Sequence, residues 1–432
     1  MSLFDYEGNI VFTSLMEPAP GDVPRVYITG ALPSSKSDGE YSVTITYKSK
    51  TQEFTSYATL KVQGDSSTRY AKKNYTVKLF TDAAHTKKDK RSFRDWSKRN
   101  KFVIKANWID ITHSRNVVGA RIWSDMVASR SDYSSLPTEM LESDNNGAID
   151  GFPVIVCANG IYYGRYSWNI PKDGMLNMDD DNLNHAMVQG QSNTDNGCKF
   201  RSTSLQYWTD EFTDDLTHVQ ARWQSILAFV STASDADFKT NLSSYFSVPS
   251  LIDWYLFGLA LFAYDSYGKN QSYLTYDGQY FICSAYDMDC ILNIFWTGYM
   301  PFQATEAWYP YYHIVYSNTN TGAHTGFEEG NYLFERLAGL FDAEIKARWA
   351  ELRKHGGALS FENIDLRFDE WCSSVSKETM AEDYASTTAE GAFTGMASIA
   401  GGNVNTNNIQ QIRQFAHDRL AYVDTLLGNG RS

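Results

Sequence analysis

The sequence predicts an α+β fold with two lobes, a β-rich N-terminal lobe and a mostly helical C-terminal lobe. Apolar residues alternate with polar ones up to about residue 168, which is the period of a strand, whereas helical spacing dominates after about residue 200. The chain has 432 residues, of which 43% are hydrophobic, enough for one large bilobal unit. We therefore expect an N-terminal arm at 1–24, a β-rich N-lobe at 25–170 and a C-lobe at 171–432.

Short alternating segments predict the strands of the N-lobe. Within 57–63 the residues Ala58, Leu60 and Val62 share one face, and a meander of antiparallel strands explains the pattern. The dipeptide Asn159-Gly160 predicts a tight hairpin turn between the last two strands. The expected strands are 26–29, 41–47, 57–63, 74–80, 102–106, 151–157 and 162–168.

Helical periodicity and end signals predict the elements that follow. Ser250 and Asp253 form a capping-box pattern before an apolar run, and Gly356-Gly357 ends a long amphipathic segment. Residues 171–200 are predicted to be rich in loops, and 280–285 to form a strand. The expected helices are 117–127, 214–231, 234–246, 250–263, 332–354 and 409–427.

Charge, cysteines and apolar runs limit the classes of function. A net charge of −13 argues against a protein that coats nucleic acid. The five cysteines show no metal-binding spacing, which favours free thiols in a reducing compartment. The longest apolar run, 254–264, is too short to span a bilayer. The first residues show no signal-peptide pattern, so we expect synthesis in the cytoplasm without a signal peptide.

Basic residues are nevertheless concentrated between positions 72 and 105. Such a stretch on an acidic protein could hold a phosphorylated ligand, and the alternative is a solvated loop face. The residues are Lys72, Lys73, Lys87, Lys88, Lys90, Arg91, Arg94, Lys98, Arg99, Lys101 and Lys105.

An acidic cluster in the C-lobe is the first candidate site. Asp265 follows a predicted apolar helix, Asn270 comes five residues later, and Asp287 and Asp289 close a short apolar strand. This order resembles a phosphoryl-transfer site, in which one Asp accepts or orients a hydroxyl proton while an Asn and a further Asp bind metal. The predicted turn Asp277-Gly278 joins these segments into one local unit.

Asp287 and Asp289 lie two residues apart, and strand geometry would place their side chains on one face, about 7 Å apart. Two neighbouring carboxylates repel each other unless a cation joins them. Mg²⁺ bound to one or two carboxylates and to substrate phosphates would relieve this repulsion. The alternative is a polar strand end without a ligand.

A glycine- and serine-rich loop in the N-lobe is the second candidate. Gly64, Ser66 and Ser67 offer backbone N–H groups and hydroxyls, which suit a phosphate chain. Strand parity places Lys73 on the core-facing side with Tyr75, where a lysine needs an anionic partner or ligand. The alternative is that Lys73 lies at the strand end and extends to water.

Several ordered segments resemble the CotH family of atypical, spore-coat-type kinases. The likeness runs from about residue 26 to 427 and includes Arg115-Asn116. The family implies a protein-kinase-like bilobal fold and use of ATP with Mg²⁺ or Mn²⁺. By this resemblance Lys73 would hold the phosphates, Asp265 would be the catalytic Asp, and Asn270 with Asp287 or Asp289 would bind metal. The other segments are 26–30, 64–79, 106–110, 159–166, 265–270 and 286–289.

Two functions are compatible with the sequence. The first is a CotH-like kinase that transfers the γ-phosphate of ATP to Ser or Thr of a protein substrate. The alternative is a phage tail or baseplate protein that reuses the fold with weak or no catalysis and binds neighbouring virion proteins or a host glycan. The absent signal peptide, the arm and the polar-aromatic composition favour this alternative.

Overall fold

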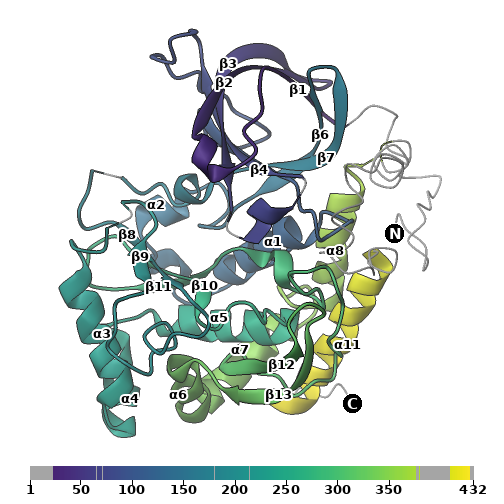
Figure 1. Ribbon diagram of the computed structural model, residues 1–432. Helices are drawn as coiled ribbons and strands as arrows, with labels where there is room; N and C mark the ends of the chain where they lie inside the picture. Colours follow the sequence, from purple (N-terminus) through teal and green to yellow (C-terminus); the bar gives the residue numbers. More distant parts are fainter. Residues whose placement is uncertain are drawn as a thin grey trace.

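Seven strands of the N-terminal part close into a barrel (Figure 1). The computed structural model describes residues 23–64, 66–70, 72–179, 181–213, 215–375, 379 and 409–428. Neighbouring strands follow the order β1-β2-β3-β4-β5-β7-β6. Their bounds are β1 Arg25–Thr29, β2 Glu40–Lys48, β3 Glu53–Gln63, β4 Asn74–Phe80, β5 Lys101–Lys105, β6 Gly151–Ala158 and β7 Ile161–Asn169.

The predicted antiparallel meander is confirmed for β1 to β5. The barrel closes because β1 also pairs with β6, in parallel, which alternation alone does not predict. The inner faces are apolar: Ala58, Leu60 and Val62 of β3 are buried, as expected from their shared parity. The hairpin between β6 and β7 turns at Asn159, whose positive φ of 51° fits the expected turn.

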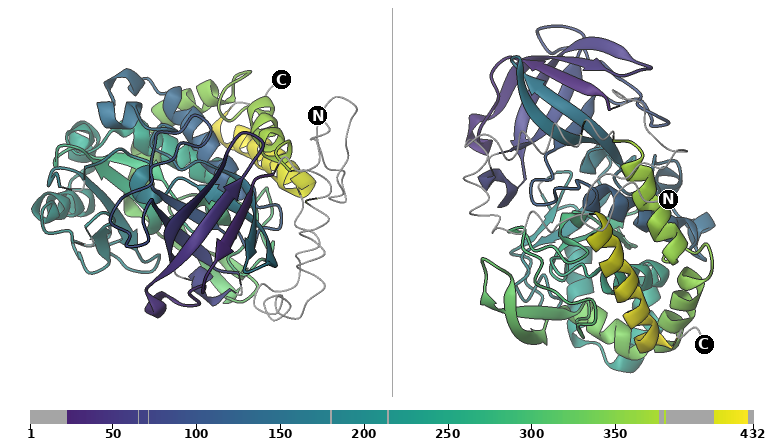
Figure 2. Two further views of the ribbon diagram at one scale, coloured as in Figure 1. Left: turned by 90° about the horizontal axis from the view of Figure 1, so that it is seen from above. Right: turned by 90° about the vertical axis from the view of Figure 1, so that its right-hand side faces the viewer.

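Helices form most of the second part, which lies below the barrel in Figure 1. In the right-hand view of Figure 2, α8 and α11 lie next to each other on the face turned toward the viewer. The helices are α1 Arg115–Ala128, α2 Thr138–Leu141, α3 Gln220–Thr232, α4 Asp235–Asn241, α5 Val248–Leu261, α6 Tyr332–Leu340, α7 Asp342–Arg353, α8 Phe361–Cys372 and α11 Ile409–Leu427.

Two smaller sheets accompany these helices. A four-stranded sheet has the order β11-β10-β8-β9, and β12 pairs with β13. The loop-rich stretch 171–200 contains one strand that the sequence does not predict, β8, because most of this strand is buried and shows no alternation. The strands are β8 Ala186–Gln191, β9 Trp208–Asp210, β10 Lys269–Thr275, β11 Ile282–Ala285, β12 Tyr312–Asn318 and β13 Ala323–Glu329.

Four helix predictions also need correction. The predicted helix 214–231 begins only at Gln220 (α3), and in the predicted helix 234–246 the α-helix ends at Asn241 (α4). The predicted helix 332–354 consists of two helices, because the chain departs from helical geometry at Phe341, between α6 and α7. Helix α5 begins before Ser250: the N-cap is Ser247, whose hydroxyl accepts from the backbone N–H of Ser250. The predicted helix 409–427 is confirmed as α11.

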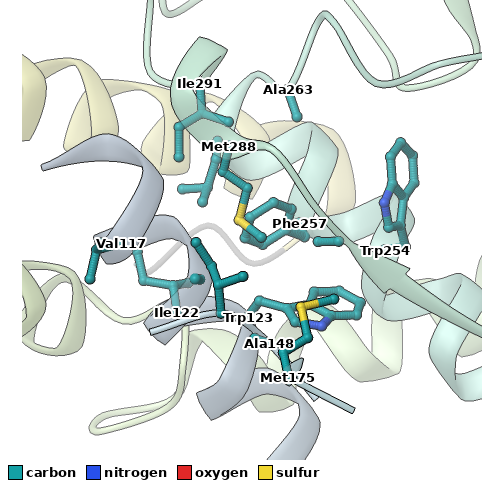
Figure 3. Packing of buried hydrophobic residues seen from close by; sticks show 14 of the residues in the cluster. Val117, Ile122, Trp123, Ala148, Met175, Trp254, Phe257, Ala263, Met288 and Ile291 are labelled. Carbon is teal, nitrogen blue, oxygen red and sulfur yellow. The ribbon is translucent and has the colours of Figure 1, made fainter. Parts of the chain in front are cut away.

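A continuous apolar core joins α1 to α5 and to the chain after β11 (Figure 3). Met288 and Ile291 pack against α1, and Gly119 makes this close approach possible. A Cβ atom at position 119 would lie 2.8 Å from Ile291 Cδ1 and 3.1 Å from Met288 Cβ. The core thereby fixes the turn that carries Asp287 and Asp289.

Three further expectations can be compared with the fold. All five cysteines are free, as expected. Among the described helices, none is both long and apolar enough to cross a membrane. The expected N-terminal arm lies almost wholly outside the described residues, which begin at Val23.

Candidate active site

The loop after α5 carries Asp265. Helix α5 ends because Phe262 adopts the left-handed conformation, with φ 54° and ψ 55°. The chain then passes through Asp265 and enters β10 at Lys269. Strand β10 pairs with β11, which leads directly to Asp287, so the expected local unit of loop, hairpin and acidic turn is present.

Polar side chains surround the Asp265 carboxylate. Asn270 Nδ2 donates to Asp265 Oδ2 (3.2 Å), and Lys269 Nζ lies 3.2 Å from the same oxygen. Asn193 Nδ2 donates to the other carboxylate oxygen, Oδ1, at 2.9 Å. Burial, together with the nearby charge of Asp287, raises the pKa of Asp265 above its usual value although Lys269 opposes the shift.

The sequence predicts Asp287 and Asp289 on one face of an extended strand, but in the structure they lie on a tight turn. Strand β11 ends at Ala285, Asp287 is left-handed with φ 55°, and Met288–Cys290 form a single 3-10 turn. Asn116 Oδ1 accepts from the backbone N–H of Met288 (3.1 Å), so the first turn of α1 holds the acidic turn in place.

Arg115 supports the chain just beyond this turn. Its guanidinium donates to the backbone carbonyls of Ile291 (2.9 Å) and Leu292 (3.1 Å), and it pairs with the buried Asp110 (2.9 Å). The dipeptide Arg115-Asn116 therefore connects α1 to the acidic turn. Its place in the sequence resemblance has a physical basis in this contact.

Lys105 lies against both acidic side chains of the turn. Its Nζ atom is 2.7 Å from Asp287 Oδ1 and 3.7 Å from Asp289 Oδ2. Burial by itself would lower the pKa of Lys105, but the charges of Asp287 and Asp289 raise it above its usual value. The last residue of β5 thus brings a cation from the barrel to the carboxylates of the second part.

The three carboxylates influence one another. Burial and the charges of Asp287 and Asp265 raise the pKa of Asp289 to about 6. Burial also acts to raise the pKa of Asp287, but the adjacent Lys105 holds it below the usual value. Three acidic side chains and two lysines, Lys105 and Lys269, therefore leave an excess of negative charge in one partly buried region.

The glycine- and serine-rich loop connects β3 and β4 and lies beside these acids. The Tyr70 hydroxyl donates to the backbone carbonyl of Trp296 in the second part. Burial, and then the charges of Cys290 and Asp289, raise the pKa of Tyr70 above its usual value. Gly64 has φ 105°, and its missing Cβ leaves space for the Ser67 hydroxyl. The side chain of Ser66 lies outside the described residues.

Lys73 does not follow the parity of the strand. Strand β4 begins at Asn74, so Lys73 belongs to the loop. Its Nζ atom donates to the backbone carbonyls of Thr68 (2.8 Å) and Tyr70 and so braces the loop from inside. The structure brings together Asp265, Asn270, Asp287 and Asp289. The lysine that contacts Asp287 and Asp289 is Lys105.

Lys105, Lys269 and Asn193 belong to this site but were not recognised in the sequence. In the sequence Lys105 is only one of many residues of the basic stretch, and Asn193 falls in a region predicted to be rich in loops. For Lys269 a signal existed, because it lies four residues after Asp265 and directly before Asn270. For the other two, the contacts depend on pairing between distant segments.

A further ion pair lies next to the acidic turn. Lys172, just after β7, pairs with Glu211 and donates to Gln189 Oε1 (3.1 Å). Its Nζ atom also lies 4.6 Å from the centre of the Tyr286 ring. This contact holds Tyr286, the residue before Asp287, beside the segment that leads out of the barrel.

The residues at this site can bind a divalent cation only if a bound ligand supplies further oxygen atoms. Among the described residues, no group of three or more His, Cys, Asp or Glu side chains is arranged to hold a metal ion. Two carboxylates on one turn suffice for Mg²⁺ when phosphate oxygens and water complete its shell. The raised pKa of Asp289, caused by burial and neighbouring carboxylates, indicates that this region would gain from an added cation.

Comparison with known proteins agrees with the sequence resemblance. A family model described as CotH kinase protein matches residues 60–423, which include the loop, Lys105 and every carboxylate of the site. No curated protein matches the chain.

Proposed function

Because the chain belongs to the CotH kinase protein family, we propose that it transfers the γ-phosphate of ATP to a Ser or Thr hydroxyl of a protein. One observation carries the proposal: Asp287 and Asp289 meet Lys105 at the end of a barrel strand, and Asp265, on a second turn, lies close enough to raise the pKa of Asp289. Phosphoryl transfer needs this combination of a proton acceptor, metal-binding oxygens and a cation for the phosphates.

In this proposal Asp287, Asp289 and Asn270 hold Mg²⁺ or Mn²⁺. The metal, when bound, would offset the charge on the phosphate oxygens. Asp287 and Asp289 supply carboxylate oxygens, and the Asn270 side chain, which lies 3.2 Å from Asp265, supplies a neutral oxygen. Lys105 would exchange part of its contact with Asp287 for the nucleotide phosphates, because one ammonium group can donate three hydrogen bonds.

Asp265 is the proposed proton acceptor. The hydroxyl oxygen of the substrate Ser or Thr would form a bond to the γ-phosphorus while the bond from that phosphorus to the β–γ bridging oxygen breaks. The hydroxyl proton passes to Asp265, and ADP leaves. Lys269, 3.2 Å from Asp265, is placed to offset charge on the transferred group. The loop with Gly64, Ser66 and Ser67 would cover the phosphates, and Lys73 would support that loop.

Phosphate transfer from γ-labelled ATP tests the proposal. Purified protein would be incubated with Mg²⁺ or Mn²⁺, alone and with a Ser/Thr-rich acceptor, beside Asp265→Ala, Asp289→Ala and Asp342→Ala. Asp342 is an exposed side chain on α7 and serves as the matched control. We expect label with wild type and Asp342→Ala, and none with the two site variants.

Two results would contradict the proposal. Label that persists in Asp265→Ala would show that the chemistry occurs elsewhere. No label with wild type, together with no thermal shift on adding ADP and metal, would remove the kinase function and leave a structural or binding role, of which the virion protein is the candidate.

A further inference from the structure

Asn193 touches the Asp265 loop through both atoms of its carboxamide. Its Nδ2 atom donates to Asp265 Oδ1 (2.9 Å) and to the Asp265 backbone carbonyl (3.2 Å). Its Oδ1 atom accepts from the backbone N–H groups of Gly268 and Lys269, both at 2.9 Å. Because a backbone N–H can only donate, these contacts fix which end of the carboxamide faces the Asp265 carboxylate.

The backbone around Asn193 is built for this contact. A Cβ atom at Gly268 would lie 2.6 Å from the Ser192 carbonyl oxygen, and one at Gly190 would lie 2.2 Å from the Gly268 carbonyl oxygen. Both distances are shorter than real Cβ contacts, so glycine at these positions lets the two segments approach. Asn193 reaches Asp265 across 72 residues of sequence because of this approach.

We propose that Asn193 is a positioning residue, which orients the Asp265 carboxylate relative to the backbone of residues 265–269 for phosphate transfer. The inference rests on the proposed function, and it adds a residue outside the carboxylates, lysines and loop already assigned. One side chain holds both the carboxylate and the two N–H groups that begin β10, so the carboxylate cannot turn without losing a hydrogen bond.

A purely structural role is the competing explanation. In that case Asn193 would fasten β8 to β10, and its loss would loosen the loop without a specific effect on the chemical step. Two substitutions separate the explanations. Asn193→Ala removes every contact, whereas Asn193→Asp keeps an oxygen that can accept from Gly268 and Lys269 but places a second oxygen against the Asp265 carboxylate.

The experiment combines steady-state kinetics with hydrogen exchange measured by mass spectrometry on peptides that cover 262–270. For Asn193→Ala we expect exchange at Gly268 and Lys269 to be about tenfold faster, since two hydrogen bonds are lost. We expect kcat to fall by roughly 10–100-fold, with KM for ATP within about twofold of wild type. Asn193→Asp should retain the slow exchange yet lose kcat to a similar extent.

Asn182→Ala is the matched control, because Asn182 Oδ1 accepts from Asn184 N (3.0 Å) in the turn before β8. It should change neither exchange at 262–270 nor kcat. Unchanged kcat in either Asn193 variant of an active enzyme would overturn this inference alone. Unchanged exchange in Asn193→Ala would show that the contact is absent. A wild-type protein that transfers no phosphate would instead overturn the proposed function, and the positioning role with it.

Discussion

Two ionic clusters of this molecule look alike in composition but differ in exposure. The first, the carboxylate site, consists of Asp265, Asp287, Asp289, Lys105 and Lys269. The second, here called the buried ion-pair cluster, consists of Asp132, Asp253, Arg130 and Arg348. In it Arg348 Nε lies 2.7 Å and Arg130 Nε 3.7 Å from Asp253, and Arg130 Nε lies 3.4 Å from Asp132.

The difference in exposure separates a site from a structural network. In the buried ion-pair cluster both carboxylates face guanidinium groups, Arg348 also pairs with the exposed Glu351 (2.8 Å), and the side chains of Arg130 and Asp253 are 0% exposed. The carboxylate site has one more acid than base, and the Asp287 side chain is 36% exposed. Excess like charge that water can reach is costly for a fold and useful for binding cations. Helix α1 connects the two clusters, since Asn116 holds one and Arg130 follows its other end.

The largest expected effect is on activity. Asp265→Asn should lower phosphate transfer by about 10²–10⁴-fold, because the proton acceptor is lost while the shape of the side chain is kept. The thermal midpoint should change little. Labelled-ATP kinetics and a melting curve on the same sample measure both, and activity within threefold of wild type would remove the distinction between the two clusters.

The reverse behaviour is expected for the buried ion-pair cluster. Asp253→Asn removes the fully buried carboxylate that Arg130 and Arg348 share, and we expect the free energy of unfolding to fall by about 3–5 kcal/mol. Phosphate transfer per folded molecule should remain as in wild type. Urea denaturation measures the first quantity, and a loss below about 1 kcal/mol would show that the cluster does not support the fold.

The pH dependence of stability should also differ. The pKa of Asp289 is about 6 in the folded protein, against an ordinary 3.8. Between these values the folded state holds a proton that the unfolded chain has lost, so stability falls as pH rises from about 4 to about 6. The loss amounts to about 3 kcal/mol. Urea denaturation with a chelator should show a smaller loss in Asp289→Asn than in wild type; some loss remains because the pKa of Asp265 is raised as well. Equal slopes for both proteins would contradict the assignment.

A smaller effect is expected where α1 meets the acidic turn. Gly119→Val would push Met288 and Ile291 away from α1, which we expect to cost about 1–3 kcal/mol of stability. Activity should fall as well, because the same turn carries Asp287 and Asp289. Gly339→Val on α6 is the control, since a Cβ atom there meets nothing within 4 Å. Equal losses for both variants would indicate a general effect of valine in a helix.

Much of the architecture could be predicted because it is encoded locally. Strand β4 and helix α11 match their predicted bounds, since each has a clear period and defined ends. The carboxylates of the site could be found for a similar reason, because Asp265, Asn270, Asp287 and Asp289 belong to one hairpin unit. These residues are close in sequence and therefore also close in space.

The remaining parts depend on long-range pairing. Lys105 is 182 residues from Asp287, and nothing in its own strand distinguishes it from Lys101 at the other end of β5. The expectation that strand parity turns Lys73 toward the core is wrong, because β4 begins only at Asn74. The left-handed conformation of Asp287 also has no signal in the sequence, because a non-glycine residue adopts it only when surrounding contacts require it.

The central claim is that Lys105 and the acidic turn form the nucleotide and metal site, and binding of Mg²⁺·ADP to Lys105→Ala and Lys73→Ala tests it most directly. Isothermal titration calorimetry should show at least about tenfold weaker binding, near 1.4 kcal/mol, for Lys105→Ala. Lys73→Ala, which loses only a brace of the loop, should bind within about threefold of wild type. Weak binding by Lys73→Ala beside unchanged binding by Lys105→Ala would contradict the account.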